Sequence, residues 1–275
     1  MATKTTKTVE TSTTSSATGI ARPSMACIAV ELTGTSPLIQ NNFSQKAIEE
    51  MLSKQMGITR QREKKKPSEV IENAVIRNVN GEVAMPPTAF KAAMLTATSA
   101  IKTFDKKKTL LKTNLFVVGN SIKIRYEKAT SRMDMVRLPS GVPDVRFRPQ
   151  FENWSARILV QYPDTLFDST SIADLVERSG RVGIGEWRPE KNGTYGTYTV
   201  TRAISSREEI NEVMRENSVL LQTPTIPEWA LNAEIDLGLL AKFAGENVSP
   251  LDTSEEAAAP EEADVSPSFV NGAAN

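Results

Sequence analysis

The order of strand-like and helix-like patterns along the chain most limits the folds that this sequence can adopt. Runs of apolar residues, mostly in alternation with polar ones, indicate strands at residues 25–32, 115–118, 121–126, 154–163 and 195–202. Apolar residues at helical spacing indicate helices at residues 44–56, 86–101, 168–180 and 205–216. Strands and helices that follow one another in this way predict a domain of mixed α and β structure.

Two of these helices carry recognisable end signals. Asp168 or Ser169 is the expected N-cap of the third helix, and Gly180 lies where a left-handed C-cap would end it. Ser206 and Glu209 have the spacing of a capping box at the start of the fourth helix.

Stripped of insertions, which include about residues 57–85 and 127–152, the core order is interpreted as strand, helix, strand, strand, helix, strand. That is the βαββαβ order of the ferredoxin-like, or RRM-like, α+β fold. We therefore predict one such domain at residues 24–245, with the large second insertion between core strands 2 and 3. A glycine-rich loop, residues 181–196, precedes the last core strand.

The two ends of the chain differ in composition from this domain. Residues 1–23 are rich in Thr and Ser, whereas residues 246–275 contain seven acidic residues and no Lys or Arg. Both compositions predict disordered tails. Lys plus Arg and Asp plus Glu each number 33, so an acidic tail leaves a basic body. No apolar run approaches the roughly 20 residues that cross a bilayer, so we expect a cytoplasmic protein without membrane contact.

Several kinds of chemistry are excluded or disfavoured by residue types. The chain has no histidine, which removes the usual general base and every imidazole metal ligand. Its single cysteine, Cys27, lies in an apolar strand pattern and is expected to be a buried structural thiol. Asp134, Asp144 and Glu186 are the candidates for a hydrolytic metal site, but no spacing forces them together. We expect no catalytic residue, metal or cofactor.

The glycine-rich loop does not match the known nucleotide-binding motifs. A dinucleotide fingerprint needs a strand before its glycines and a helix after them, whereas here a helix precedes the loop and a strand follows it. Two interpretations remain. In one, the loop is a structural turn whose Trp187 fills the core. In the other, its backbone clamps a polynucleotide, and the glycines that permit close approach are Gly183, Gly185, Gly193 and Gly196.

A basic segment, residues 102–148, predicts a binding surface for nucleic acid. It holds twelve Lys and Arg residues against four Asp and Glu, with aromatic residues between them, as in grooves for single strands. Phe147 and Trp187 are expected to stack on bases. The cations expected to contact phosphates, from this segment and the glycine-rich loop, are Lys123, Arg125, Arg146, Arg148, Arg181, Arg188 and Lys191.

The glycine-rich loop between a second helix and a last strand resembles the repeat-associated mysterious protein (RAMP) superfamily, which includes backbone and RNA-processing subunits of CRISPR effector complexes. In backbone subunits, an insertion between the second and third strands forms a thumb that wedges between nucleotides, and residues 127–152 occupy that place here. The sequences LTGTSPLIQNNFS, MPPTAFKAAML, DVRFRPQFENW and VGIGEWRPEKNGTYG also resemble uncharacterised bacteriophage-encoded proteins. RNA-processing members commonly use a histidine, which this chain lacks, so the resemblance implies binding without cleavage.

The sequence therefore predicts a non-catalytic protein of phage type that coats single-stranded RNA or DNA by assembling side by side into an oligomer or filament. A first alternative is a phage structural or inhibitory protein that acts through protein–protein contacts. A second alternative is a metal-dependent nuclease.

Overall fold

The computed structural model describes residues 24–43, 45–57, 66–101, 104, 108–137 and 140–231. Contacts between residues divide the chain into a first unit that ends at Thr225 and a second that begins at Ile226. The tails predicted at residues 1–23 and 246–275 lie outside the described residues.

The first unit contains both strands and helices, as predicted. In chain order they are β1 (Met25–Gly34), β2 (Leu38–Ile39), α1 (Gln45–Gln55), α2 (Pro67–Asn73), β3 (Ala84–Met85), α3 (Pro87–Ala97), η1 (Thr98–Ala100), α4 (Lys108–Asn114), β4 (Phe116–Val117), β5 (Ile122–Arg125), β6 (Lys128–Arg137), β7 (Pro143–Glu152), β8 (Ser155–Pro163), α5 (Ser169–Val182), η3 (Pro189–Lys191), β9 (Tyr198–Ile204) and α6 (Arg207–Asn217). The described helix of the second unit is α7 (Glu228–Leu231).

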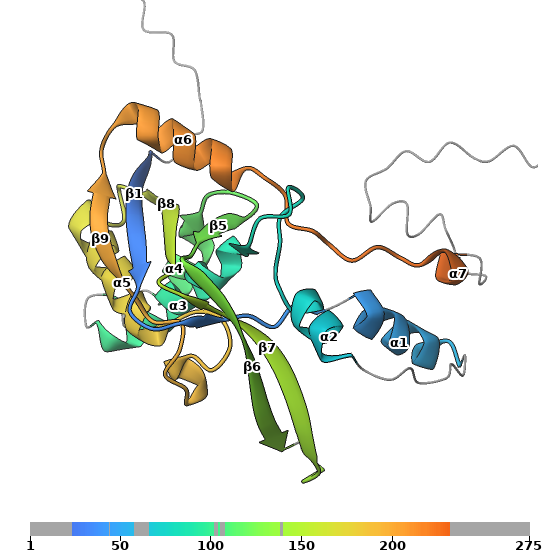
Figure 1. Ribbon diagram of the computed structural model, residues 1–275. Helices are drawn as coiled ribbons and strands as arrows, with labels where there is room; N and C mark the ends of the chain where they lie inside the picture. Colours follow the sequence, from blue (N-terminus) through green and yellow to red (C-terminus); the bar gives the residue numbers. More distant parts are fainter. Residues whose placement is uncertain are drawn as a thin grey trace, which may run out of the picture. The chain divides into compact units, whose positions relative to one another are not determined.

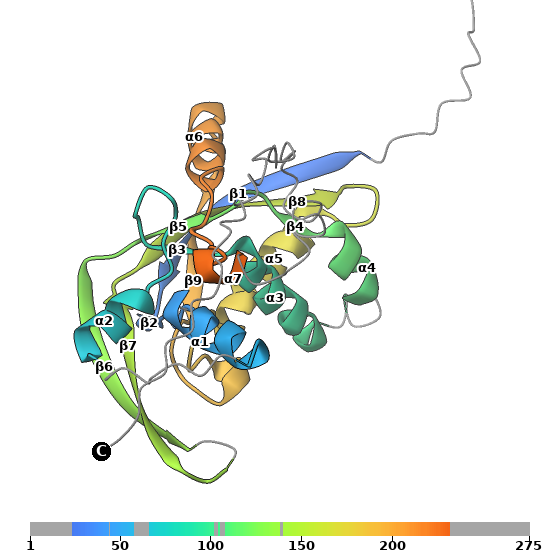
Figure 2. The same cartoon turned by 90° about the vertical axis from the view of Figure 1, so that its right-hand side faces the viewer.

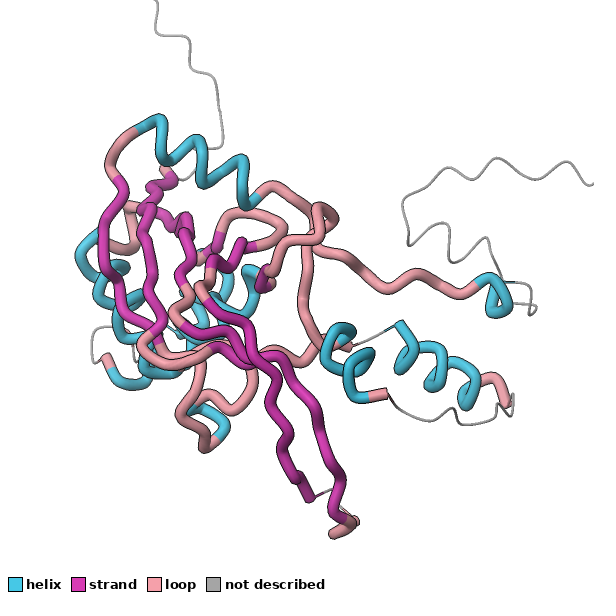
Figure 3. Tube along the Cα trace, in the orientation of Figure 1, coloured by secondary structure: helices cyan, strands magenta, loops and turns pink. Residues whose placement is uncertain are grey.

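The main sheet has the strand order β3-β5-β8-β1-β9, and β4 pairs with β8 beside this path. All of its paired strands are antiparallel. Figure 3 shows the strands as magenta segments. Helices α3 and α5 pack against each other and cover one face. The predicted α+β class, with antiparallel strands and helices on a sheet, is confirmed.

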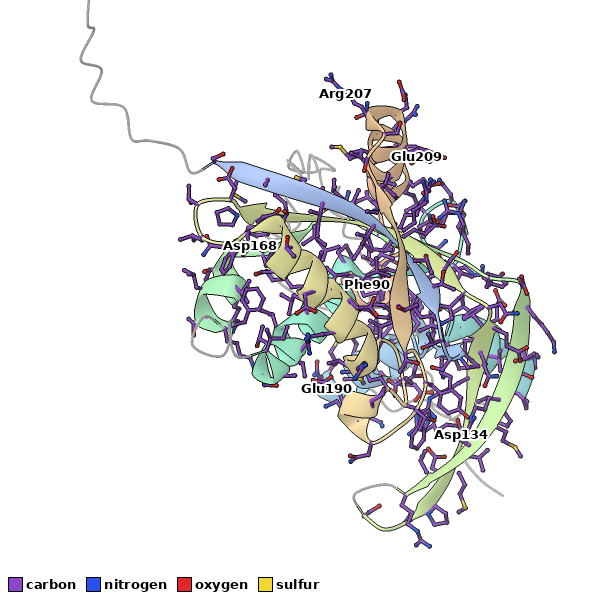
Figure 4. The ribbon with its side chains drawn as sticks, turned by 90° about the vertical axis from the view of Figure 1, so that its left-hand side faces the viewer. Phe90, Asp134, Asp168, Glu190, Arg207 and Glu209 are labelled. Carbon is purple, nitrogen blue, oxygen red and sulfur yellow. The ribbon has the colours of Figure 1, made fainter. Side chains whose placement is uncertain are left out.

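The main core lies between this sheet and helices α3 and α5. It includes Val30 and Leu32 from β1 and Phe90 and Met94 from α3, and Figure 4 shows Phe90 in its centre. Trp154 is fully buried there, with its indole N–H donating to the Ser36 carbonyl at 2.8 Å. The alternation in residues 25–32 and the helical spacing in residues 86–101 therefore indicated the correct faces.

Helix α6 packs on the other face of the sheet (Figures 1 and 2). Its Val213 forms a small apolar cluster with Ala29, Leu159 and Ile204. Cys27 also lies on this face of β1, but it is exposed, so the prediction of a buried thiol was wrong. The cause is the limited reach of the α6 cluster, whose contact with β1 is at Ala29.

One of the predicted helix ends is wrong. Asp168 does cap α5, accepting from the Ser171 amide at 2.8 Å, and Figure 4 shows it at the helix start. However, α5 continues past Gly180. The glycine is needed for the close approach of β9, since a Cβ there would lie 1.9 Å from the Tyr198 carbonyl oxygen. The C-cap is Gly183, at φ 76°.

The capping box predicted for α6 does not form. Ser206 precedes the helix but makes no side-chain cap, and its hydroxyl instead donates to the Glu208 carboxylate at 2.8 Å.

The two predicted insertions contain regular structure. The first carries α2 and β3, for which the sequence indicated no element. The second is an antiparallel hairpin in which β6 pairs with β7 from Lys128 opposite Glu152 to Arg137 opposite Pro143. The base of β7 also pairs with β2, and the hairpin then projects away from the main sheet (Figure 1).

Candidate nucleic-acid interface

The β6–β7 hairpin presents chemically different side chains on its two faces. Opposite pairs Met133–Phe147 and Met135–Val145 share one face. Met133 and Met135 are each 69% exposed and Val145 is 48% exposed, whereas Phe147 is part-buried. We call these four residues the apolar hairpin face. Large apolar side chains grouped on a projecting element are typical of a binding surface.

The opposite face carries a buried polar cluster at the hairpin base, which we call the Arg–Asp cluster: Arg132, Asp134 and Arg148. The Arg132 Nε donates to Asp134 at 2.6 Å, and Arg148 Nη1 lies 3.5 Å from the second carboxylate oxygen. Asp134 and Arg148 are each 8% exposed. Figure 4 shows Asp134 on the hairpin, among the side chains drawn where it meets the glycine-rich loop.

The Arg–Asp cluster attaches the hairpin to the glycine-rich loop. Arg132 Nη1 donates to the Tyr195 hydroxyl at 2.5 Å, and its guanidinium lies 4.8 Å from the centre of that ring. The Arg148 guanidinium lies 5.7 Å from the centre of the Trp187 ring. Such cation–π contacts stabilise by about 0.5–2 kcal/mol each. The hydrogen bond from Arg132 to Asp134 is the main reason that the pKa of Arg132 is raised.

The structure therefore brings the second insertion and the glycine-rich loop together. However, Arg148 and Trp187 contact each other within the protein and do not face a ligand. Arg148 was predicted to contact phosphate, yet it is buried against Asp134. Trp187 is part-buried and is not one of the buried core residues, so it does not fill the core as the first interpretation required. Its indole N–H is buried without a hydrogen-bond partner.

The glycines of the loop make their close approaches within the chain. A Cβ on Gly193 would lie 1.7 Å from the Trp187 carbonyl oxygen, and one on Gly196 would lie 1.8 Å from that of Ile184. Gly185 has φ 78°, and a Cβ on it would lie 2.4 Å from the Ile39 carbonyl oxygen. These contacts favour the structural turn over a backbone clamp.

The loop amides are also largely engaged. The Ile184 amide donates to the Gly196 carbonyl at 3.0 Å, and the Gly196 amide donates to the Pro37 carbonyl at 2.8 Å. Glu186 donates to Ile39 at 2.9 Å, and Tyr195 donates to Trp187 at 3.0 Å. Gly183 is the remaining glycine of the predicted set, and its amide closes α5 by donating to Ser179 at 3.1 Å.

Two predicted phosphate contacts on β5 are paired with carboxylates. Lys123 forms an ion pair with Glu82, and Arg125 lies 2.5 Å from Glu216 of α6. The hydrogen bond from Lys123 is the first cause of the lowered pKa of Glu82. Arg157 of β8 joins Glu216 at 2.6 Å, so α6 neutralises the cationic side of the sheet.

Of the four other predicted cations, Arg146, Arg181 and Lys191 are exposed and Arg188 is part-buried. Arg146, which is 46% exposed, pairs with Asp144 at 2.8 Å on the hairpin. Arg188 pairs with Glu190 at 2.8 Å. Arg181 and Lys191 are exposed, and within the described part of the chain no ion pair involves them. These cations and the apolar hairpin face form the candidate interface.

Sequence reasoning missed Phe43, an exposed aromatic residue between β2 and α1. It lines a cleft of about 330 Å³ that also contains Val145, Arg146 and Phe147, so it adds to the same surface. The available signal was an aromatic residue directly after Asn41 and Asn42 in a polar connection.

Over the described ranges, no group of three or more Cys, Asp or Glu side chains is placed to hold a metal ion. None of the helices described has the length and apolar character needed to cross a membrane.

Neither a protein-family model nor a curated protein sequence matches this chain. Among solved structures, it is similar to a chain of type III-B Cmr-beta bound to cognate target RNA, with a TM-score of 0.45 and 8% identity. That match covers 66% of this chain and 60% of the other. It is also similar to Cmr6 from Pyrococcus furiosus, with a TM-score of 0.33, 11% identity and coverage of 64% and 99%.

Both similarities are weak in sequence and in structure. Because both TM-scores are below 0.5, the likeness carries no weight for what this chain binds. The comparisons lend no support to a bacteriophage origin, which stays a prediction.

Proposed function

We propose that this protein binds single-stranded RNA or DNA without cleaving it, along the apolar hairpin face and the surface cations near it. The observation that carries this proposal is the exposure of Met133, Met135 and Val145 beside Phe147 on one face of a projecting hairpin. Unpaired bases offer flat apolar surfaces, and side chains of this kind bind them with little dependence on base identity.

The surface cations near this face also favour a ligand that carries phosphates. Arg146 pairs across from Asp134 and so points to the other face of the hairpin, but it lines the same cleft as Val145 and Phe147. Arg181 and Lys191 belong to the glycine-rich loop, which supports the hairpin. Each cation that meets a phosphate releases counterions from a single strand and adds about 0.7 to the slope of log affinity against log salt.

We also propose that the core is ferredoxin-like and that copies assemble side by side on the strand. The order β5-β8-β1-β9, with α3 and α5 on one face, supports the ferredoxin-like assignment. Side-by-side assembly and a phage setting rest only on the sequence resemblances.

The exposed methionines also favour a second candidate, a protein partner. Unbranched, polarizable Met side chains adapt to varied protein surfaces. The nuclease alternative has less support, because Asp134 is paired with Arg132 and Arg148, and Asp144 is paired with Arg146.

The first experiment measures binding of labelled single-stranded RNA, single-stranded DNA and duplex across a range of salt concentrations. We expect both single strands to bind more tightly than duplex, with a negative salt slope. Binding of duplex alone, or of no strand at low salt, would contradict the proposal, and the latter would favour the protein partner.

Variants with matched controls then test where the nucleic-acid interface lies. Arg146→Ala is expected to reduce the slope by roughly 0.7. Arg178→Ala is the matched control, because Arg178 is 50% exposed and pairs with Asp174 at 2.9 Å, much as Arg146 pairs with Asp144. Likewise, Met133→Ser with Met135→Ser should weaken binding, whereas Met214→Ser on α6 should not. Equal effects in variant and control would place the interface elsewhere.

A further inference from the structure

Phe43 stands between two clefts on the side of the molecule next to the apolar hairpin face. The first, of about 330 Å³, is bounded by α1, α2 and the hairpin, and we call it the hairpin cleft. The second, of about 300 Å³, is bounded by residues near α2 and by Gln222 and Thr225, and we call it the amide cleft. Both clefts include Asn42, Phe43 and Asn73 in their walls.

The main chain that carries Phe43 is held in place. The Asn42 amide donates to the Ala74 carbonyl at 2.8 Å, and the buried Gln40 side chain bonds both Ala84 and Ile76 at 2.9 Å. Phe43 is nevertheless 54% exposed. A large ring kept in water on a fixed connection has no role in the core, so its position between two clefts needs another explanation.

The lining of the clefts selects the kind of ligand. Phe43 and Phe147 give the hairpin cleft two aromatic rings, and the side-chain amides of Asn42, Asn73 and Gln222 can pair with the edges of bases. A volume near 300 Å³ is at the small end of ligand sites, which suits one base rather than a peptide helix.

The charges at the clefts are nearly balanced. Lys66 pairs with Glu69 at 2.8 Å at the rim of the hairpin cleft, and Arg77 pairs with Glu72 at 2.6 Å in the amide cleft. A ligand here is therefore recognised by stacking and hydrogen bonds more than by charge.

We propose that Phe43 separates two successive unpaired bases of a bound single strand, one in the hairpin cleft and one in the amide cleft. This inference rests on the proposed function and adds to it a base-binding site. Phe147 lines the first cleft and belongs to the apolar hairpin face, so the strand passes from that face into the cleft. Binding by this site depends on the presence of bases and not on the number of phosphates.

The test compares an intact 12-nucleotide strand with a strand of the same length that carries abasic positions. Loss of base stacking on one aromatic side chain lowers affinity roughly 5- to 150-fold. Phe43→Ala should show a loss of that size for the intact strand, a much smaller loss for the abasic strand, and an unchanged salt slope. Phe43→Trp should restore binding. The fluorescence of a strand that carries 2-aminopurine should be quenched when it binds the wild-type protein, and quenched less when it binds Phe43→Ala.

Phe116→Ala is the matched control, because Phe116 is 45% exposed and lies on β4, outside both clefts. Thermal unfolding should be nearly unchanged in both alanine variants, since neither ring is buried. If wild type binds strands but Phe43→Ala behaves as Phe116→Ala does, the base-binding site is wrong and the proposed function stands. If wild type binds no single strand, the proposed function fails first.

Discussion

Replacement of Asp134 is expected to destabilise the protein far more than replacement of its partner Arg148. Asp134→Asn keeps the side-chain shape but removes the negative charge that faces two guanidinium groups, at 2.6 Å from Arg132 and 3.5 Å from Arg148. Because Arg148 is 8% exposed, its charge would be left buried and uncompensated.

The expected losses of folding stability differ between Asp134→Asn and Arg148→Met because the two side chains have different partners. Removing one partner of a buried ion pair costs roughly 3–5 kcal/mol, and we take about 3 kcal/mol because Arg132 retains its bond to Tyr195. Arg148→Met removes a buried cation whose Nε and Nη1 have no hydrogen-bond partner, while Asp134 keeps its bond to Arg132. An apolar side chain of similar length should therefore change stability by no more than about 1 kcal/mol.

Thermal and urea unfolding followed by circular dichroism check this prediction. For a domain of this size, about 3 kcal/mol corresponds to a fall in Tm of roughly 6–12 °C for Asp134→Asn, against less than about 4 °C for Arg148→Met. The same proteins are then tested for oligonucleotide binding. Arg148→Met should leave the salt slope unchanged. If it lowers the slope as Arg146→Ala does, Arg148 contacts phosphate and the reasoning from burial is refuted.

Three further predictions concern stability. Gly196→Ala should destabilise by several kcal/mol more than Gly81→Ala in urea unfolding, because both have positive φ but only Gly196 has a carbonyl oxygen in the space of the new Cβ. The lowered pKa of Glu82 beside Lys123 means that its contribution to stability is present at neutral pH and is lost as pH falls below the usual Glu range, so Glu82→Gln should flatten the dependence of stability on pH there. Burial raises the pKa of Tyr198, whose contribution is lost as pH rises above about 10, and Tyr198→Phe should remove that alkaline loss.

Local patterns predicted the strands and helices that form the main core, because burial of one face leaves a period in the sequence. The helix with Phe90 and Met94 and the alternation of β1 are of this kind. The helix ends were less predictable. Gly180 looks like a stop signal, but it is needed for the approach of Tyr198, and that contact joins residues from different elements.

The candidate site was harder to predict than the fold, because charge counts do not record partners that are distant in sequence. Arg125 looks available in a basic segment, yet it meets Glu216 of α6, 91 residues away. Arg146 and Arg148 share one side of an extended strand, but the loop covers only Arg148. Phe43 carries no charge, so the role proposed for it follows only from the clefts around it.

The Arg–Asp cluster also determines how the glycine-rich loop and the β6–β7 hairpin are arranged relative to each other. A clamp would require the glycine-rich loop and the basic insertion to face a ligand from two sides. Instead, Arg132 and Arg148 hold the polar side of the hairpin against Tyr195 and Trp187, and the glycines make room for that packing. The opposite side, with Met133 and its neighbours, is therefore turned outward and next to the cleft of Phe43. The loop supports the hairpin, and the hairpin presents the surface, so variants in the loop should act first on stability and variants on the outward face should act first on binding.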